Sequence, residues 1–108
     1  PFEYFDETVH MQAVANAGLT ISLTADEGSR TAYLPATIGL LMRNGLSEKA
    51  AFEGVTINPA KTLGLEDRVG SLEVGKDADI AIFDGHPFSS LSLCRLSMID
   101  GEVVHNIM

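Results

Sequence analysis

The sequence has no tryptophan, a single cysteine and only seven basic residues among 108. Because Cys94 has no partner cysteine, the chain can form neither an internal disulfide nor a Cys-x-x-Cys zinc pair. Seven basic against fifteen acidic residues, with a net charge of −8, argue against nucleic-acid binding. No apolar run approaches the roughly 18 residues of a membrane span. We therefore expect neither nucleic acid nor a membrane as a partner, and the compartment stays open between cytoplasm and periplasm.

The first part of the chain has helical periodicity, interrupted by one alternating segment. Leu19–Leu23 alternates apolar and small polar residues, which predicts a strand with residues 19, 21 and 23 on one face. Before it, a helix is expected over 2–17, ended by Gly18. Three helices are expected after it. The first runs from residue 31 to Asn44, and the second follows a cap at Ser47. The third begins at an Asn58 cap, has Pro59 in its first turn and ends at Gly64.

Beyond residue 64 the pattern changes to short strands. Ile80–Phe83 is an apolar run between turn formers and predicts a buried strand. Further strands are expected over 71–74, 93–99 and 102–105, with the two-residue hairpin signal Asp100-Gly101 between the last two. The change predicts two units, residues 1–64 and 65–108.

A long motif carries a family resemblance. Residues 56–79 contain T-x-N-P-A-x-x-L-G, and then G-S-L-x-V-G-K-x-A-D. This run resembles the C-terminal end of the amidohydrolase superfamily of metal-dependent hydrolases, nearest to the imidazolonepropionase-like and Xaa-Pro dipeptidase-like members, and the likeness extends over residues 18–105. A complete (β/α)8 barrel needs about 250 residues. The resemblance therefore implies an α/β fold: the last strand and helices of such a barrel over 1–64, followed by part of a small β-sandwich over 65–108.

The resemblance also implies one site residue. In this family the last barrel strand ends in an aspartate that binds the catalytic metal and takes a proton from water, and Asp26 matches that position. Ala25 and the Asp26-Glu27-Gly28 continuation depart from the usual pattern, so a register in which Glu27 is the acid stays open. On the residues alone, an Asp after a strand is a turn former or helix cap. Arg30 could bind a substrate carboxylate through two hydrogen bonds, or it could be an ordinary surface arginine.

The other metal ligands of the family have no counterpart motif in this chain. Its histidines, His10, His86 and His105, lack the short spacing of a zinc site, and we expect them to be surface or partly packed residues. A divalent metal, expected to be zinc, is implied for the parent protein, and none is expected to bind this fragment. Lys76 and Asp77 are expected to be solvated and Asp79 to be a hydrogen-bonding turn residue. The loop over 70–76 lacks the Ser or Thr and the helix of a phosphate loop.

Two functions from different classes follow. The first is a fragment, inactive by itself, of an amidohydrolase that cleaves an amide, cyclic amide or dipeptide C–N bond of a small molecule with metal-activated water. The alternative is a non-catalytic β-sandwich scaffold or oligomerisation module over residues 65–105. Because strands without neighbours present open edges, we expect a homo-oligomer or edge-strand association in either case.

Overall fold

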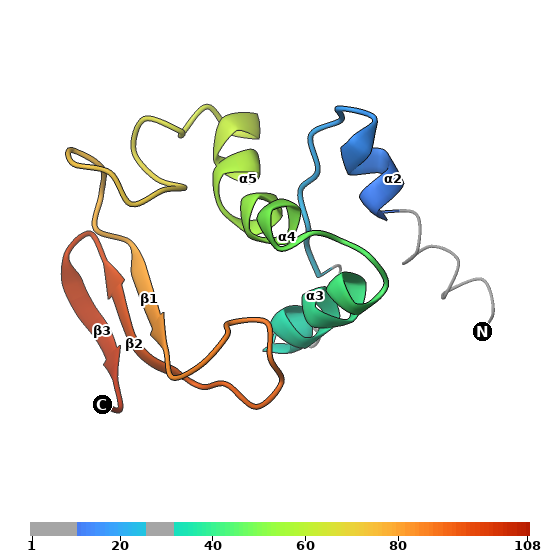
Figure 1. Cartoon of the computed structure of the whole chain (residues 1–108). Helices are drawn as coiled ribbons and strands as arrows, with labels where there is room; N and C mark the ends of the chain where they lie inside the picture. Colours follow the sequence, from blue (N-terminus) through green and yellow to red (C-terminus); the bar gives the residue numbers. More distant parts are fainter. Residues whose placement is uncertain (1–10, 26–31) are drawn as a thin grey trace.

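The computed structural model describes residues 11–25 and 32–108, in which helices precede a three-stranded antiparallel sheet (Figure 1). The predicted α/β composition is confirmed. The helices are α2 (Met11–Asn16), α3 (Leu34–Arg43), α4 (Glu48–Val55) and α5 (Ile57–Thr62). The strands are β1 (Ile80–Phe83), β2 (Cys94–Ile99) and β3 (Glu102–Asn106). None of the helices in these described residues has the length and apolarity to cross a membrane.

Most helix ends lie where the sequence predicts them. Gly18 follows α2 with a φ of +82°, and Gly64 follows α5 with a φ of +71°, the left-handed region that glycine adopts without strain. The Ser47 hydroxyl accepts a hydrogen bond from the Ala50 amide at 3.2 Å and so caps α4. The predicted cap at Asn58 is wrong, because α5 begins at Ile57 after Thr56 as the N-cap residue, and Asn58 lies inside the helix.

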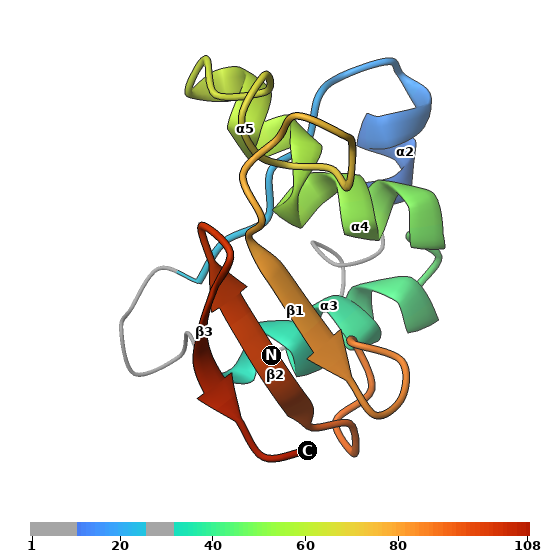
Figure 2. The ribbon, with the colours of Figure 1, turned by 90° about the vertical axis from the view of Figure 1, so that its left-hand side faces the viewer.

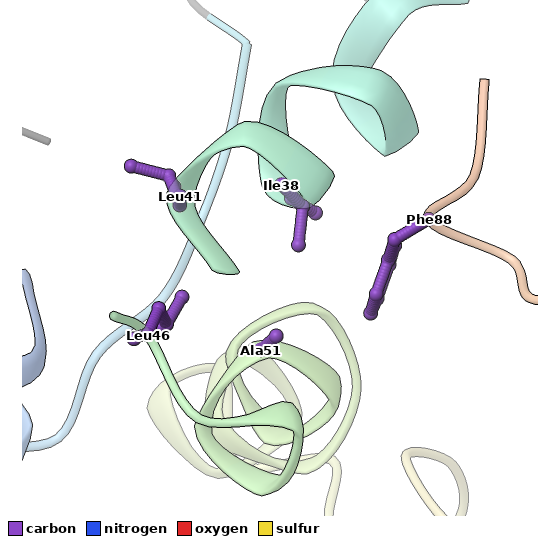
Figure 3. Close-up of a cluster of buried hydrophobic side chains, with 5 residues drawn as sticks. All are labelled: Ile38, Leu41, Leu46, Ala51 and Phe88. Carbon is purple, nitrogen blue, oxygen red and sulfur yellow. The ribbon is translucent and has the colours of Figure 1, made fainter. Parts of the chain in front are cut away.

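The core lies between α3 and α4 (Figure 3). It consists of five buried residues: Ile38, Leu41, Leu46, Ala51 and Phe88. Ile38 is 1% exposed, and Phe88 reaches this cluster from the loop between β1 and β2. The strands and the loops between them, from Ile80 to Asn106, are called the β part of the chain below. The core joins the helices to this β part through one aromatic side chain, that of Phe88.

The sheet has the order β1-β2-β3, with β3 at one edge beside β2 (Figure 2). Asp100 and Gly101 join β2 to β3 with φ values of +49° and +79°, as a type I′ hairpin turn requires. The predicted burial of β1 is wrong, since Ile82 is 43% exposed. All five residues of β3 are exposed. The described residues thus leave the sheet largely uncovered.

Two predicted strands are absent from the described residues. Residues 71–74 lead into a turn in which the Lys76 amide donates to the Glu73 carbonyl at 3.2 Å. Residues 19–25 run as a nearly straight segment after α2 (Figure 1), without a strand partner. A strand exists only in a hydrogen-bonded ladder, so the alternating pattern alone does not produce one. The predicted alternation in burial holds from Thr20 to Thr24, where Ile21 is buried and Leu23 half-buried between exposed residues. It fails at Leu19, which was expected on the same face and is 62% exposed.

The chain exposes more surface than a compact domain of its size. Its accessible surface is 7728 Å², against about 5,800 Å² for a compact monomer of this mass. Its radius of gyration is 14.8 Å, against about 13 Å for a compact domain of this length. Exposed apolar residues include Leu72, Val74 and Leu91. The division into 1–64 and 65–108 stays a prediction.

Candidate functional site

The predicted acid lies next to the segment that the structure describes. Asp26, the alternative acid Glu27 and the candidate substrate residue Arg30 lie outside the described residues, and their roles stay predictions. The described chain ends at Ala25 on this side and resumes at Ala32. What the structure does define is how the segment leading to Asp26 is held.

Two hydrogen bonds hold this segment against the junction of α4 and α5. The side-chain amide of Asn58 donates to the Ile21 carbonyl at 2.8 Å, and the Leu23 amide donates to the Gly54 carbonyl at 2.8 Å. Ile21 is 8% exposed, so its carbonyl is satisfied by protein rather than by bulk water. From the sequence, Asn58 was expected only to cap a helix, and its place in the motif was the only signal for this contact.

Gly54 allows the segment to come this close. A Cβ at this position would lie 3.1 Å from the Leu23 side chain and 3.5 Å from the Ile21 carbonyl oxygen. The 3.1 Å distance is shorter than an ordinary van der Waals contact, and the 3.5 Å distance is near the lower limit of one. A side chain here would therefore push the segment away from α4. Gly54 and Asn58 therefore determine together how the chain approaches Asp26.

His86 has a structural role in this geometry. Its Nδ1 accepts the Phe88 amide proton at 3.1 Å, and its Nε2 lies 2.7 Å from Glu48 Oε1. Because a backbone amide can only donate, Nδ1 is the acceptor and Nε2 carries the proton that is donated to Glu48. The imidazole also contacts the Phe52 and Phe88 rings, at centroid distances of 5.6 and 5.7 Å. The expectation of a partly packed histidine is confirmed here.

His105 and Cys94 lie close together without forming a nucleophile–base pair. His105 Nε2 is 3.1 Å from the Cys94 carbonyl oxygen, whereas the Cys94 thiol is 3.3 Å from the Ser97 hydroxyl. Cys94 is half-buried, as expected of a packed cysteine. The remaining histidine, His10, lies outside the described residues.

The described residues do not fit a metal site. Over residues 11–25 and 32–108, no group of three or more His, Cys, Asp or Glu side chains could hold a metal ion. A catalytic zinc needs about three protein ligands. The predicted metal ligand Asp26 would have to act with residues that this part of the chain does not supply.

The loop after α5 is held by its own charged side chains. Asp79 accepts the Asp100 amide proton at 2.8 Å, which confirms its role as a hydrogen-bonding residue. Asp77 pairs with Arg68 at 2.7 Å. The expectation that Lys76 is solvated is wrong, because its side chain is only 12% exposed and pairs with Glu73 at 3.0 Å. Asp77 is likewise only 24% exposed.

Two carboxyl groups in the β part have lowered pKa values. A hydrogen bond from the Ser71 hydroxyl, together with the Lys76 ammonium, lowers the pKa of Glu73. The pKa of Asp84 is lowered first by the Leu93 amide, which donates at 2.8 Å, and then by Arg95, whose guanidinium contacts it at 2.9 and 3.0 Å. Both carboxylates accept hydrogen bonds from nearby turn residues, and these contacts account for the lowered pKa values.

Comparison with known proteins gives one consistent family. The amidohydrolase family profile matches residues 6–106. The imidazolonepropionase of Sphingopyxis alaskensis is 40% identical over 80 residues, which is 68% of this chain and 19% of that protein. The imidazolonepropionase of Fusobacterium nucleatum is 32% identical over 93 residues, 77% of this chain and 21% of that protein.

Solved structures agree with the sequence comparison. The crystal structure of an amidohydrolase from Thermotoga maritima superposes with a TM-score of 0.84 at 36% identity, and the match covers 92% of this chain and 26% of that one. A second amidohydrolase, at 24% identity and a TM-score of 0.75, shares the fold. The chain thus spans about a fifth of the length of the curated relatives it matches.

Proposed function

This chain belongs to the amidohydrolase family, as the motif over 56–79 predicted, and from that premise we propose that it is the C-terminal part of a metal-dependent hydrolase of C–N bonds. The observation that carries the proposal is the 40% identity with a protein named imidazolonepropionase over 80 residues. The bond cleaved would be that of an amide, a cyclic amide or a dipeptide. Imidazolonepropionate is the first substrate to test.

In the parent protein, residues 19–25 would be the last strand of a (β/α)8 barrel and α3 to α5 would belong to its helical layer. The alternating burial of Ile21 and its exposed neighbours supports this placement. The strand neighbours that the segment lacks here would come from the rest of the parent. The buried Oε2 atom of Glu66, which has no hydrogen-bond partner among the described residues, also agrees with missing neighbours.

The three strands would form part of the small β-sandwich. The cross-strand pairs Ile80–Met98, Ile82–Leu96 and Met98–Val103 place five apolar side chains on one face. Ile82 is 43% and Val103 47% exposed. An apolar sheet face of this kind is typical of half a sandwich, in which a second sheet covers it.

In this proposal Asp26 holds a proton from the attacking water and returns it to the leaving amine, which is the work of a general base and then a general acid. Arg30 would bind a carboxylate of the substrate. When bound, a divalent metal, expected to be zinc, would supply an activated water to such a site. Since the described residues supply no ligand set, the 108-residue chain alone is expected to be inactive.

The test uses the full-length parent protein. Its metal content is measured, and hydrolysis of imidazolonepropionate and of an Xaa-Pro dipeptide is followed before and after treatment with a chelator. The proposal predicts a bound divalent metal and hydrolysis of at least one probe, lost with the chelator and restored by the metal. The 108-residue chain is the matched control and should hydrolyse neither. A folded parent that lacks both metal and hydrolysis would contradict the proposal.

The second candidate, an association module, is favoured by the open sheet. β3 is exposed along its whole length, and its outer edge is unpaired in the part of the chain that the structure describes. We propose that the isolated chain associates with a second copy through the apolar face and this edge. Val103→Lys should weaken association in light scattering, whereas Glu102→Lys, on the opposite face of β3, should not. A monodisperse monomer of the unmodified chain would contradict it.

A further inference from the structure

A polar cavity of about 320 Å³ lies between α2, the segment that follows it, α4 and α5, which are neighbours in Figure 1. This volume is at the lower end of the range for small-molecule sites, about 300–1,000 Å³. We propose that the cavity binds a free α-amino acid with a short apolar side chain, because opposite charges, unused hydrogen-bonding groups and small apolar residues meet there. Such binding would be independent of hydrolysis elsewhere in the parent protein.

Hydrogen bonds between distant parts of the chain hold the cavity walls together. The Gln12 side-chain oxygen accepts the Ser47 amide proton at 2.7 Å and joins α2 to α4. The Asn58 side-chain amide donates to the Ile21 carbonyl at 2.8 Å and joins α5 to the segment after α2. The paired residues are 35 and 37 positions apart along the chain. The cavity is therefore formed before a ligand arrives, which lowers the ordering cost of binding.

Three polar groups of the lining have hydrogen-bonding capacity left over. Asn16 accepts from Gln12 through its side-chain oxygen at 2.8 Å, which leaves its nitrogen as a donor. Ser47 accepts the Ala50 amide proton at 3.2 Å, which leaves its hydroxyl proton to donate. Asn58 donates through its side-chain nitrogen, which leaves its side-chain oxygen as an acceptor. As far as the structure describes the chain, the cavity thus offers two donors and one acceptor to a ligand.

Lys49 and Glu53 place opposite charges at the cavity. They lie one turn apart on α4, with Lys49 Nζ 3.8 Å from Glu53 Oε1. This contact is looser than the 3.0 Å pair of Lys76 and Glu73, and its two side chains are 85% and 42% exposed. Because an exposed pair of this kind contributes little to stability, a ligand can separate it at low cost. A zwitterion would satisfy both charges, with its carboxylate on Lys49 and its ammonium group on Glu53.

The charge balance and the unused groups define the class of ligand. Lys49 and Glu53 are the charged residues of the lining, so its formal charge is zero and a ligand without net charge fits it. The donors of Asn16 and Ser47 suit the carboxylate of the ligand, and the oxygen of Asn58 suits its ammonium group. Both ends of a free amino acid would therefore find a charged partner and a neutral one.

Apolar residues of the lining determine which ligand side chain fits. Ala15 and Ala50 have small side chains that leave room, and Leu19, which lines the same cavity, is 62% exposed. A short aliphatic side chain would cover Leu19 and remove apolar surface from water. L-Valine is therefore the first probe.

The experiment titrates the full-length parent protein with three probes by calorimetry. L-Valine carries both charges, L-valinamide lacks the carboxylate, and N-acetyl-L-valine lacks the ammonium group. Hydrogen exchange with and without L-valine, followed by mass spectrometry, locates binding on peptides that cover 12–21 and 47–58. Lys49→Ala and Glu53→Ala remove one charge each, and Ala15→Phe fills the cavity. Lys61→Ala is the matched control, since Lys61 is an exposed lysine on α5 outside the lining.

L-Valine should bind with a Kd on the order of 1 mM and slow exchange in both peptides. L-Valinamide and N-acetyl-L-valine should bind at least about threefold more weakly, and Lys49→Ala and Glu53→Ala should weaken L-valine binding by a similar factor. Ala15→Phe should abolish binding, whereas Lys61→Ala should leave Kd unchanged. If Ala15→Phe does not fold, Asn16→Ala removes a donor at the exposed end of α2 and should weaken binding instead.

Three results would each overturn the proposal. In the first, L-valine does not bind the folded parent, or it binds without slowing exchange over 12–21 and 47–58. In the second, the Lys49 and Glu53 variants bind L-valine as tightly as Lys61→Ala does. In the third, L-valinamide binds as tightly as L-valine, which would mean that the cavity does not recognise a zwitterion.

Discussion

Replacing Phe88 with alanine should separate the sheet from the helices. Phe88 is 8% exposed and is the member of the buried cluster that comes from the β part of the chain. Its ring lies 4.7 Å from that of Phe52, and its carbonyl oxygen lies where any Cβ on Gly39 would have to be. The loop between β1 and β2 is thus pressed directly against α3.

The magnitude follows from the contacts that are lost. A buried Phe→Ala change costs about 3–5 kcal/mol, which includes about 0.5–1.5 kcal/mol from the aromatic pair with Phe52. Such a loss raises the equilibrium constant for local opening by about 150- to 5,000-fold. The expected result is faster exchange in both α3 and β1, because the side chain joins the two.

The assay is hydrogen exchange followed by mass spectrometry on the full-length protein, read on peptides that cover 34–43 and 80–83. Leu91→Ala is the matched control, since Leu91 lies in the same loop and is 91% exposed. It should change stability by no more than about 0.5 kcal/mol. The reasoning is refuted if Phe88→Ala speeds exchange by less than about fivefold, or if Leu91→Ala has an equal effect.

Three further predictions concern local features, and each is tested by urea denaturation of the full-length protein. Ser47→Ala removes the cap that accepts the Ala50 amide proton and should cost about 1 kcal/mol, whereas Ser47→Asp should not. Gly70→Ala should cost about 1–3 kcal/mol more than Gly75→Ala, because both have positive φ but only at Gly70 would a Cβ meet α5, at 2.9 Å; equal costs would contradict this. Because the pKa of Asp84 is lowered from a value near 3.8 in the unfolded chain, this group stabilises the fold above that pH, and the stabilisation is lost as pH falls through the folded-state pKa. Asp84→Asn should therefore flatten the acid side of the plot of stability against pH. Parallel plots for the variant and the unmodified protein would contradict the assignment.

Local rules were sufficient to predict the helices and the hairpin of β2 and β3. The Ser47 cap and the helical periodicity before it act within a few residues, and α3 and α4 lie where these signals predict. The Asp100-Gly101 turn aligned β2 and β3 to within one residue of their predicted ends, because both residues must take positive φ in such a turn.

The failures have a common physical cause. Residues 19–23 and 71–74 have a strand pattern but no neighbouring strand in the described chain, and pairing is a property of two segments rather than one. The burial expected of β1 fails for the same reason, since its apolar face has nothing to cover it among the described residues. The contact between Asn58 and Ile21 joins residues 37 positions apart, so no local pattern predicts it.

The candidate site was predicted only as far as the family resemblance reaches. The motif over 56–79 identified the family, and the family match over 6–106 confirmed it. The role of Asp26 was assigned by matching the sequence to a family pattern, and such a pattern contains no distances between atoms. The proposed site would need further metal ligands from elsewhere in the parent, and this chain spans only about a fifth of the length of the curated relatives it matches.

The most direct test of the account compares Asp26→Asn with Glu27→Gln in the full-length protein, by the kcat for imidazolonepropionate hydrolysis. Both changes remove one negative charge at adjacent positions, so general charge effects cancel between them. If Asp26 is the acid at the end of the last barrel strand, Asp26→Asn should lower kcat by about 10²- to 10⁴-fold, and Glu27→Gln should leave it nearly unchanged. A large loss in Glu27→Gln with an active Asp26→Asn would contradict the account.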